Sequence, residues 1–287
     1  MTGTLLSFGH GYSAKALDAR LLPKGWRIIG TTRSTEKADT LQARGVEPLV
    51  FPGDDPTEAI AAATHILISA GPDVDGDPVL RHAEAALAEA TGVEWLGYLS
   101  TTGVYGDHDG GWVDETTPLT PSTRRGQARV EAETVWQALA TSANLPLHIF
   151  RLAGIYGPGR GPFAKVRSGT ARRIIKKGQV FSRIHVEDIA AVLAASIAQP
   201  NPGAIYNLCD DDPAPPEDVI AHAAELLGLP IPPAVDFETA EMSEMARSFY
   251  AESKRVRNDR IKDELGVVLK YPDYRAGLAA LLAAERA

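Results

Sequence analysis

Short apolar runs alternate with longer segments of helical periodicity through the first half of the chain. The runs stand at residues 5–8, 26–31, 46–51, 65–69, 95–100 and 147–151. Helix signals lie between them: Ser34 precedes a helical stretch that stops at Gly45, and Pro78 opens an alanine-rich stretch that closes near Gly92. Strand and helix in alternation predict an α/β protein with a doubly wound parallel sheet.

The alternation loosens after Arg151. A basic stretch at residues 165–177 has helical periodicity, a second helix is predicted at residues 185–200, and a short strand is predicted at residues 204–208. The proline-rich segment DDPAPPED follows. We therefore predict a sheet domain and a smaller C-terminal α/β lobe, formed respectively by residues 1–156 with 181–209 and by residues 157–180 with 210–287.

Composition and charge narrow the class of protein. With 287 residues, 44% hydrophobic and 23% charged, the chain is long enough to bury a sizeable core. The net charge of -8 opposes binding to nucleic acid or to anionic membranes. One cysteine, no secretory pattern at the N-terminus and no long apolar run lead us to expect a cytoplasmic protein without a membrane partner.

A glycine-rich turn follows the first predicted strand. Gly9, Gly11 and Ala14 form a G-x-G-x-x-A pattern at the start of a helix. Gly9 permits the tight turn, Gly11 lets a pyrophosphate approach the backbone, and Ala14 keeps helix and strand close. The amides at the helix start, at Tyr12 and Ser13, then face the anion. The pattern predicts dinucleotide binding; the alternative is a plain strand-to-helix turn.

The end of the second strand bears on the choice between NADP and NAD. NAD-binding proteins carry an acidic residue there for the ribose 2′-hydroxyl, whereas this strand reads WRIIGTTRS. Arg33, with Thr31, Thr32 and Ser34 beside it, suits a 2′-phosphate instead. We expect NADP as the cofactor, with NAD as the alternative, and a solvated surface role remains open for Arg33.

Two later segments are further candidates for cofactor contacts. Asp54, after the third strand, is placed by the fold near the adenine, although a loop carboxylate that caps the next helix is an equal alternative. Ser69, Ala70 and Gly71, after the fourth strand, leave room for the cofactor beside the backbone.

Several motifs in order resemble one superfamily. They are YLSTTGVYGDHDGGWVDETTP, RRGQARVEAE, FRLAGIYGPG, IHVEDIA and IYNLCDDDP. Together they resemble the extended short-chain dehydrogenases/reductases, in particular the atypical members described as NAD-dependent epimerase/dehydratase-like, and the resemblance covers nearly the whole chain. It implies a Rossmann domain with a small C-terminal substrate lobe.

The resemblance implies roles for several residues near the cleft. The Ser or Thr that lies four residues before the Tyr of V-Y-G maps onto Thr101, ahead of Tyr105, and we assign Ser100 to the cofactor side. Thr101 would hydrogen-bond a substrate oxygen; the alternative is a hydroxyl that satisfies the strand end. Gly154 follows the strand where the family covers the nicotinamide. Tyr105 and Tyr156 are candidate acids, although buried structural tyrosines are the commoner case.

The family's Tyr-x-x-x-Lys pair falls on Arg125 and Arg129. An arginine cannot exchange a proton near neutral pH, so the usual proton transfer is lost. On one helical face, Arg125 and Arg129 would form a fork for a carboxylate or phosphate, and Arg129 would hold the nicotinamide ribose as the lysine does. The alternative is a solvated basic helix turn.

Three other positions are assigned no substrate-binding, metal-binding or catalytic role. Relatives that bind nucleotide-sugars often have an arginine four residues before the histidine at 185, whereas this chain has Phe181 there and Arg183 two residues later. His108 lies in a glycine-rich polar loop, so no metal site is expected. Cys209 has no partner in sequence and is assigned no catalytic role.

Two hypotheses follow from these observations. In the first, the chain is an NADP-dependent reductase, dehydrogenase or epimerase that acts on a small polar carbonyl or hydroxyl compound, an anionic one if the arginines face the cleft. In the second, it is a catalytically inactive NADP(H)-binding sensor or regulatory protein. We expect a monomer or a homodimer.

Overall fold

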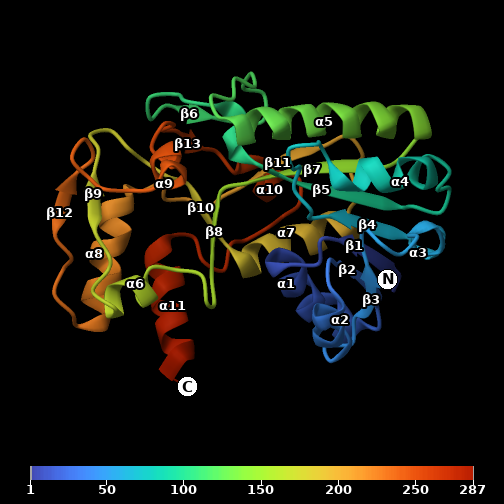
Figure 1. The fold of residues 1–287 in the computed structure, drawn as a ribbon, viewed down its shortest axis with the longest axis horizontal. Helices are drawn as coiled ribbons and strands as arrows, with labels where there is room; N and C mark the ends of the chain where they lie inside the picture. The colour runs from blue at the N-terminus through green and yellow to red at the C-terminus, as the bar shows by residue number, and fades with distance from the viewer. Residues whose placement is uncertain (1, 287) are drawn as a thin grey trace.

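A computed structural model describes residues 2–286 (Figure 1). Its centre is a seven-stranded sheet whose strands run β11-β7-β5-β4-β1-β2-β3 in space. Every neighbouring pair is parallel. The strands are β1 (Thr4–Phe8), β2 (Arg27–Thr32), β3 (Glu47–Val50), β4 (His65–Ile68), β5 (Trp95–Thr101), β7 (Leu147–Leu152) and β11 (Ile205–Leu208). The doubly wound α/β fold predicted from the sequence is confirmed.

Helices cover both faces of the sheet, as Figure 1 shows. One face carries α1 (Tyr12–Leu21), α2 (Thr35–Gln42) and α7 (Val186–Ala198), and the other carries α3 (Thr57–Ala62), α4 (Pro78–Ala88) and α5 (Arg124–Ala143). Side chains alternate across the strands between these layers: Leu5 packs in the core beside α1 and α7, and Leu6 in the core beside α4 and α5. Because successive side chains of a strand point to opposite faces of the sheet, the apolar residues of these strands form two separate cores, one on each face.

The helix boundaries follow local signals. Asp77 caps α4, because its carboxylate accepts hydrogen bonds from the amides of Val79 and Leu80. Thr123 caps α5 in the same way through Gly126 N. These caps place the start of α5 at the carboxyl edge of the sheet.

The basic stretch at residues 165–177 does not form the single helix that its periodicity predicts. Instead α6 (Phe163–Arg167) stops near Gly169, which has φ 69°, and β9 (Arg173–Ile175) follows. β9 pairs in parallel with β12 (Ala234–Asp236), a partner distant in sequence. Tertiary pairing outweighs the local helical pattern here.

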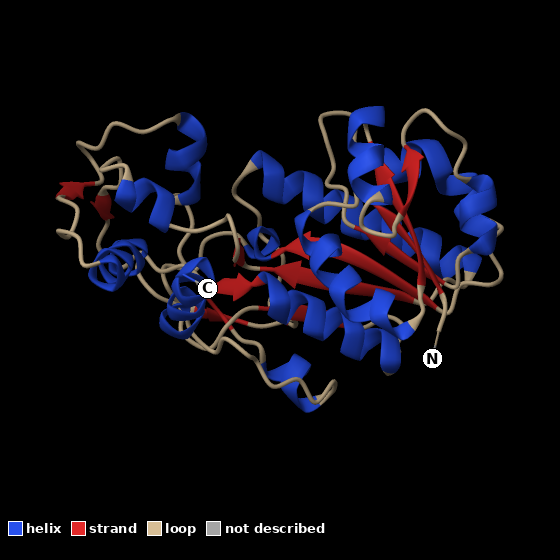
Figure 2. Cartoon of the chain, turned by 90° about the horizontal axis from the view of Figure 1, so that it is seen from below, coloured by secondary structure: helices blue, strands red, loops and turns tan. Residues whose placement is uncertain are grey.

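The smaller lobe lies at one end of the sheet (Figure 2). Its apolar core joins α6, α8 (Pro216–Leu227) and α11 (Tyr274–Arg286) through side chains such as Phe163, Val219 and Leu278. The short helix α9 (Glu244–Phe249) lines the cleft through Ser248 and Phe249. Two short strands, β8 (Gly154–Tyr156) and β10 (Arg183–His185), pair where sheet and lobe meet.

Part of the predicted lobe packs on the sheet domain instead. β13 (Arg255–Val256) pairs with β6 (Trp112–Val113), and α10 (Asp259–Asp263) follows it. Apolar side chains of this segment, among them Ile261 and Leu269, join the core beside α1 and α7. Assigning all of residues 210–287 to the lobe is therefore too wide. Among residues 2–286, no helix is long and apolar enough to cross a membrane.

Candidate functional site

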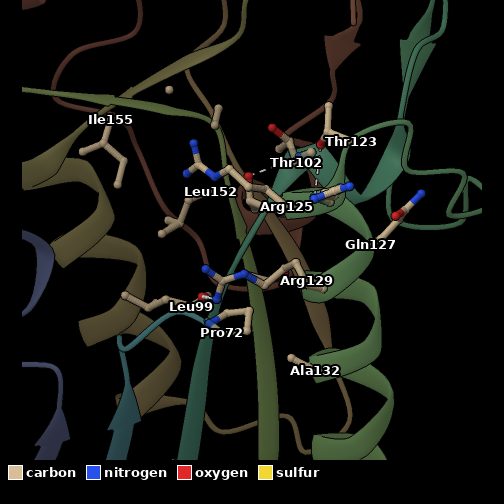
Figure 3. Close-up of a pocket in the computed structure, with 18 of the residues that line it drawn as sticks. Pro72, Leu99, Thr102, Thr123, Arg125, Gln127, Arg129, Ala132, Leu152 and Ile155 are labelled. Atoms are coloured by element: carbon tan, nitrogen blue, oxygen red, sulfur yellow. Dashed lines mark hydrogen bonds between the residues drawn. The ribbon is translucent and has the colours of Figure 1, made fainter. Parts of the chain in front are cut away.

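The sheet order reverses between β1 and β4, since the chain leaves these neighbours toward opposite edges. Such a reversal opens a crevice at the carboxyl ends of the strands. A cleft of about 1890 Å³ lies there. It is lined by the glycine-rich turn, the ends of β4 and β5, the first turns of α5 and the lobe. Figure 3 shows the part of the cleft between β5 and α5, with Leu99 and Arg129 labelled.

The glycine-rich turn has the geometry that its sequence predicts. Gly9 has φ 72°, and a Cβ added to it would lie 2.7 Å from the backbone N of Ala70. The Gly9 amide donates to the Thr31 hydroxyl at 2.7 Å, which holds the turn to β2. A Cβ added to Gly11 would meet only Gly9 O, at 3.6 Å. The backbone at Gly11 therefore faces open space in the cleft.

The start of α1 fits an anion. Gly11 is its N-cap residue and provides no side-chain cap, and the first turn holds no acidic residue. Tyr12 and Ser13 line the cleft, whereas Ala14 is 1% exposed and packs in the core. Free amides and the positive end of a helix dipole thus point toward the cleft.

The structure separates the other cofactor candidates. Arg33 is exposed at the end of β2 and has no hydrogen bond or ion pair with the described residues. Asp54 accepts a hydrogen bond from Val50 N at 3.0 Å and closes its own turn, away from the residues that line the cleft. Ser69 lines the cleft, whereas Gly71 is not among the lining residues and lies against the Arg129 guanidinium.

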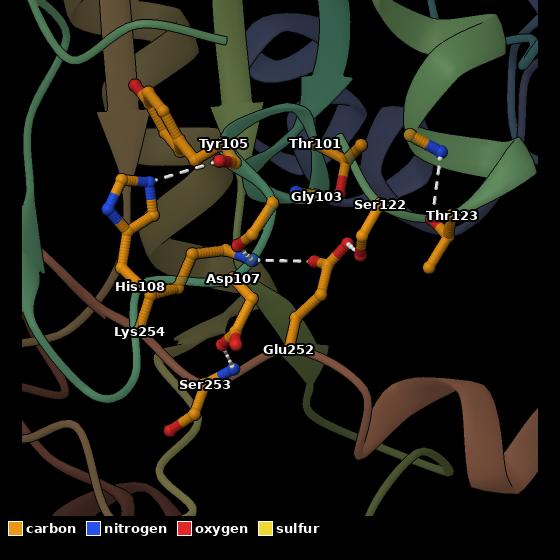
Figure 4. Close-up of polar contacts among 12 residues, drawn as sticks. Thr101, Gly103, Tyr105, Asp107, His108, Ser122, Thr123, Glu252, Ser253 and Lys254 are labelled. Atoms are coloured by element: carbon orange, nitrogen blue, oxygen red, sulfur yellow. Dashed lines mark hydrogen bonds and ion pairs between the residues drawn. The ribbon is translucent and has the colours of Figure 1, made fainter. Parts of the chain in front are cut away.

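Ser100 and Thr101 both line the cleft at the end of β5. The Ser100 hydroxyl donates to Oε1 of the buried Glu133. The Thr101 hydroxyl accepts from Gly103 N at 3.2 Å and so satisfies the strand end (Figure 4). Because it acts there as an acceptor, its own proton is available for an oxygen in the cleft.

The two tyrosines considered as acids have other partners. Tyr105 is fully buried, and its hydroxyl donates to Asn207 Oδ1 at 2.7 Å and accepts from Arg151 Nη1 at 3.0 Å. Burial raises its pKa to about 12. Tyr156 lines the cleft, but its hydroxyl donates to Asp273 O at 3.3 Å and burial raises its pKa further. Neither phenol exchanges a proton near neutral pH, and we do not retain Tyr105 as an acid.

Arg125 and Arg129 of α5 line the cleft at different depths (Figure 3). Arg129 Nη1 donates to Leu99 O at 2.8 Å and to the Tyr98 hydroxyl at 3.1 Å. Its Nη2 lies against Gly71, 2.8 Å from the position of a Cβ there. Arg125 is exposed, with its guanidinium carbon 5.7 Å from the centre of the Phe249 ring. Arg125 and Arg129 therefore do not form the single fork that their spacing predicts.

Sequence reasoning missed an ionisable pair on the opposite wall. Lys254 Nζ is 2.7 Å from Glu252 Oε2 and donates to Gly106 O at 2.7 Å (Figure 4). Glu252 Oε1 accepts from the Ser122 hydroxyl at 2.7 Å. Lys254, Glu252 and Ser122 line the same cleft as Thr101. No local motif marks Lys254, because only the folded tail brings it beside Gly106.

His108 and Arg183 both form hydrogen bonds with backbone carbonyl oxygens. His108 Nε2 hydrogen-bonds with Tyr105 O at 3.1 Å, and residues 2–286 contain no cluster suited to a metal ion. Arg183 lines the cleft, but its Nη1 donates to the carbonyl oxygens of Phe181 and Ala214. The free thiol of Cys209 is buried and donates to Val256 O.

Two curated relatives match nearly the whole chain. Protein YeeZ of Escherichia coli (strain K12) is 29% identical over 282 residues, which cover 92% of this chain and 95% of the relative. The 3-diazoavenalumate denitrifying reductase of Streptomyces sp is 25% identical over 305 residues and covers 97% and 94%.

Solved structures show the same fold. A functionally unknown conserved protein from Silicibacter pomeroyi DSS is 63% identical with a TM-score of 0.93, over 99% of this chain and all of that one. MoeE5, solved in complex with UDP-glucose and NAD, is 21% identical with a TM-score of 0.78, over 99% of both chains. Residues 79–209 match the sequence model of the NAD dependent epimerase/dehydratase family. The chain thus matches the NAD dependent epimerase/dehydratase family over residues 79–209 and shares the fold of MoeE5 over nearly its whole length.

Proposed function

We propose that this protein binds NADP(H) and acts as a reductase, dehydrogenase or epimerase on a small polar carbonyl or hydroxyl compound that carries an anionic group. The observation that carries the proposal is the uncapped start of α1, which meets open space at Gly11 where the sheet order reverses. The positive helix start and the open space at Gly11 both favour a dinucleotide pyrophosphate at this position.

The preference for NADP rests on Arg33. It supplies an unpaired guanidinium at the end of β2, in a strand whose end, Thr31–Thr32, holds no acid. A 2′-phosphate offers this fork a bidentate partner, whereas a 2′-hydroxyl does not. MoeE5 was solved with NAD, so the proposal sets this chain apart from that neighbour.

The bound nicotinamide supplies or accepts a hydride. Around it, the chain orients the substrate and handles the proton. We assign Arg129 to the nicotinamide ribose, because it lines the cleft and its Nη2 lies beside Gly71, in the segment that follows β4. Thr101 donates a hydrogen bond to the substrate oxygen. Arg125, exposed at the rim, binds the anionic group of the substrate.

The Lys254–Glu252 pair is our candidate for proton transfer. An ammonium group has three N–H donors, and Lys254 uses two of them on Gly106 O and Glu252. The third is free for an oxygen held by Thr101 in the same cleft. Unlike the arginines, a lysine releases and recovers a proton, so this pair supplies what the lost Tyr-x-x-x-Lys arrangement does not.

Calorimetric titration with NADP(H) and NAD(H) tests the cofactor assignment. Wild-type protein is compared with Arg33→Gln and with Arg27→Gln, a matched control on the same strand whose guanidinium is paired with Glu47 at 2.6 Å. We expect NADPH to bind more tightly than NADH by about tenfold or more, since hydrogen bonds to charged groups contribute about 1.5–3 kcal/mol. Arg33→Gln should abolish that preference and Arg27→Gln should keep it. If neither NADP(H) nor NAD(H) binds, the proposal is overturned.

A screen of aldehydes and ketones that carry a carboxylate tests the proposed reductase activity. Turnover of each compound is monitored by the decrease in NADPH absorbance. Lys254→Met should lower turnover about 100-fold, the scale of general acid catalysis, while the affinity for NADPH stays the same. NADPH binding without turnover of any compound would favour the second function, a sensor or regulatory protein. The arginines at both positions of the usual catalytic pair are the observation behind that alternative.

A further inference from the structure

A loop of the lobe contacts the first residue of α1, next to the glycine-rich turn. The loop spans residues 157–161 and follows β8. The Tyr12 hydroxyl donates to Pro158 O at 3.0 Å, and the guanidinium carbon of Arg160 lies 5.7 Å from the centre of the Tyr12 ring. Tyr12 is the first residue of α1, so Arg160 stands beside the helix start that we assign to the pyrophosphate.

Arg160 has no negative partner in the described part of the chain. It is exposed and lines the same cleft as Gly11 and Ser13. Arg167, seven residues later, differs in this respect, because its guanidinium forms an ion pair with Glu285. An unpaired cation beside an uncapped helix start makes a site for an anion with two sources of positive charge.

The loop holds Arg160 in place. Gly157 N donates to Arg160 O at 2.9 Å, and Arg160 N donates to Gly157 O at 2.9 Å, so the turn closes on itself. A Cβ on Gly157 would lie 2.5 Å from the Tyr12 hydroxyl oxygen, which shows how closely the loop packs on α1. A guanidinium over an aromatic ring keeps its in-plane N–H groups free for a phosphate.

We propose that Arg160 is a diphosphate-binding residue, supplied by the lobe to the dinucleotide that the sheet domain holds. The inference rests on the proposed function and deepens it, because it assigns a residue of the second lobe to the cofactor. The α1 amides and the Arg160 guanidinium would hold the diphosphate between them. Cofactor binding therefore joins the loop at residues 157–161 to the glycine-rich turn.

Titration calorimetry with three probes tests this assignment. NADPH carries both a diphosphate and a 2′-phosphate, ADP-ribose carries only the diphosphate, and 2′-AMP carries only the 2′-phosphate. Arg160→Gln should weaken NADPH and ADP-ribose about tenfold or more, as expected for a lost hydrogen bond to a charged group, and leave 2′-AMP within about twofold. Arg33→Gln should weaken NADPH and 2′-AMP and leave ADP-ribose unchanged.

The controls separate the possible failures. Arg167→Gln removes a paired cation of the same lobe and should change none of the three affinities. Arg160→Lys keeps the charge and should recover part of the ADP-ribose affinity. Unchanged ADP-ribose affinity in Arg160→Gln overturns the inference and leaves the proposed function intact. Wild-type protein that binds none of the probes overturns both.

Discussion

The Arg151 guanidinium and the Glu133 carboxylate form a buried ion pair beneath the cleft, with Nη2 and Oε2 2.7 Å apart and both side chains 3% exposed. Arg151 Nε also donates to Glu133, which accepts the Ser100 hydroxyl as well. The pair thus ties α5 to β7 and β5 at the end of the strands that carry the site.

Removing one partner of this pair should destabilise the fold. Glu133→Gln leaves the Arg151 charge buried without its counter-ion, and breaking such a pair costs about 3–5 kcal/mol. Urea-induced unfolding measures the loss, and Glu133→Gln combined with Arg151→Met should recover part of it. A single variant less than about 1 kcal/mol below wild type would contradict a buried, intact pair.

Tyr105→Phe should affect stability and spare the cofactor site. The variant removes the hydroxyl that partners Asn207 and Arg151, and leaving buried polar groups unpaired costs about 1–3 kcal/mol. We expect a lower urea midpoint and unchanged NADPH affinity by calorimetry. Full stability together with lost turnover would restore Tyr105 as a catalytic candidate.

Gly11→Ala should separate binding from folding. The new methyl group meets only Gly9 O at 3.6 Å, so the thermal midpoint should stay within about 2 °C of wild type. The same methyl group occupies the space proposed for the pyrophosphate, and NADPH affinity should fall at least tenfold. Gly92→Ala, at a position with nothing within 4 Å, is the matched control and should keep full affinity. An unchanged NADPH affinity in Gly11→Ala would argue against the glycine-rich turn as the pyrophosphate site.

Asp210 should make the protein less stable as pH rises. Burial raises its pKa from 3.8 to about 8, so between these values the folded state holds a proton that the unfolded state has lost. The free energy of unfolding then falls with increasing pH. Burial lowers the pKa of His185 from 6.5 to about 4, which acts in the opposite sense, but only below pH 6.5.

Urea unfolding between pH 6.5 and pH 8 therefore isolates Asp210 from His185. Asp210→Asn has no proton to lose, and its slope against pH should be flatter than that of wild type. Equal slopes for the two proteins would show that Asp210 ionises normally in the fold.

Much of the sheet domain could be predicted from local patterns. The six early strands were placed to within a residue or two of each end, because apolar runs of strand length are short and the helices between them have clear stops. The glycine-rich turn after β1 was predicted from Gly9 and Gly11, and parallel topology brings it to the reversal of strand order. These features depend on residues close together in sequence.

The remaining features depend on distant contacts. Tyr105 lies in a motif that suggests a cleft residue, yet Arg151 and Asn207 hold it in the core. Lys254 reaches Gly106 only because the tail folds back over the site. The spacing of Arg125 and Arg129 predicts that they share one helical face, but it does not predict their hydrogen-bond partners. Arg129 donates to Leu99 O on the neighbouring strand, a contact between residues that are distant in sequence.

The returning tail also bears on how such proteins can diversify. Residues 255–269 belong to the sheet domain, whereas the segments on either side of them contribute α9 and α11 to the lobe side of the molecule. The smaller lobe is thus formed by segments that are separate in sequence, and a single crossover cannot transfer it from one relative to another. Exchange of specificity between relatives has to proceed by point substitution in the cleft walls, or by chimaeras whose several junctions preserve the β6–β13 pairing.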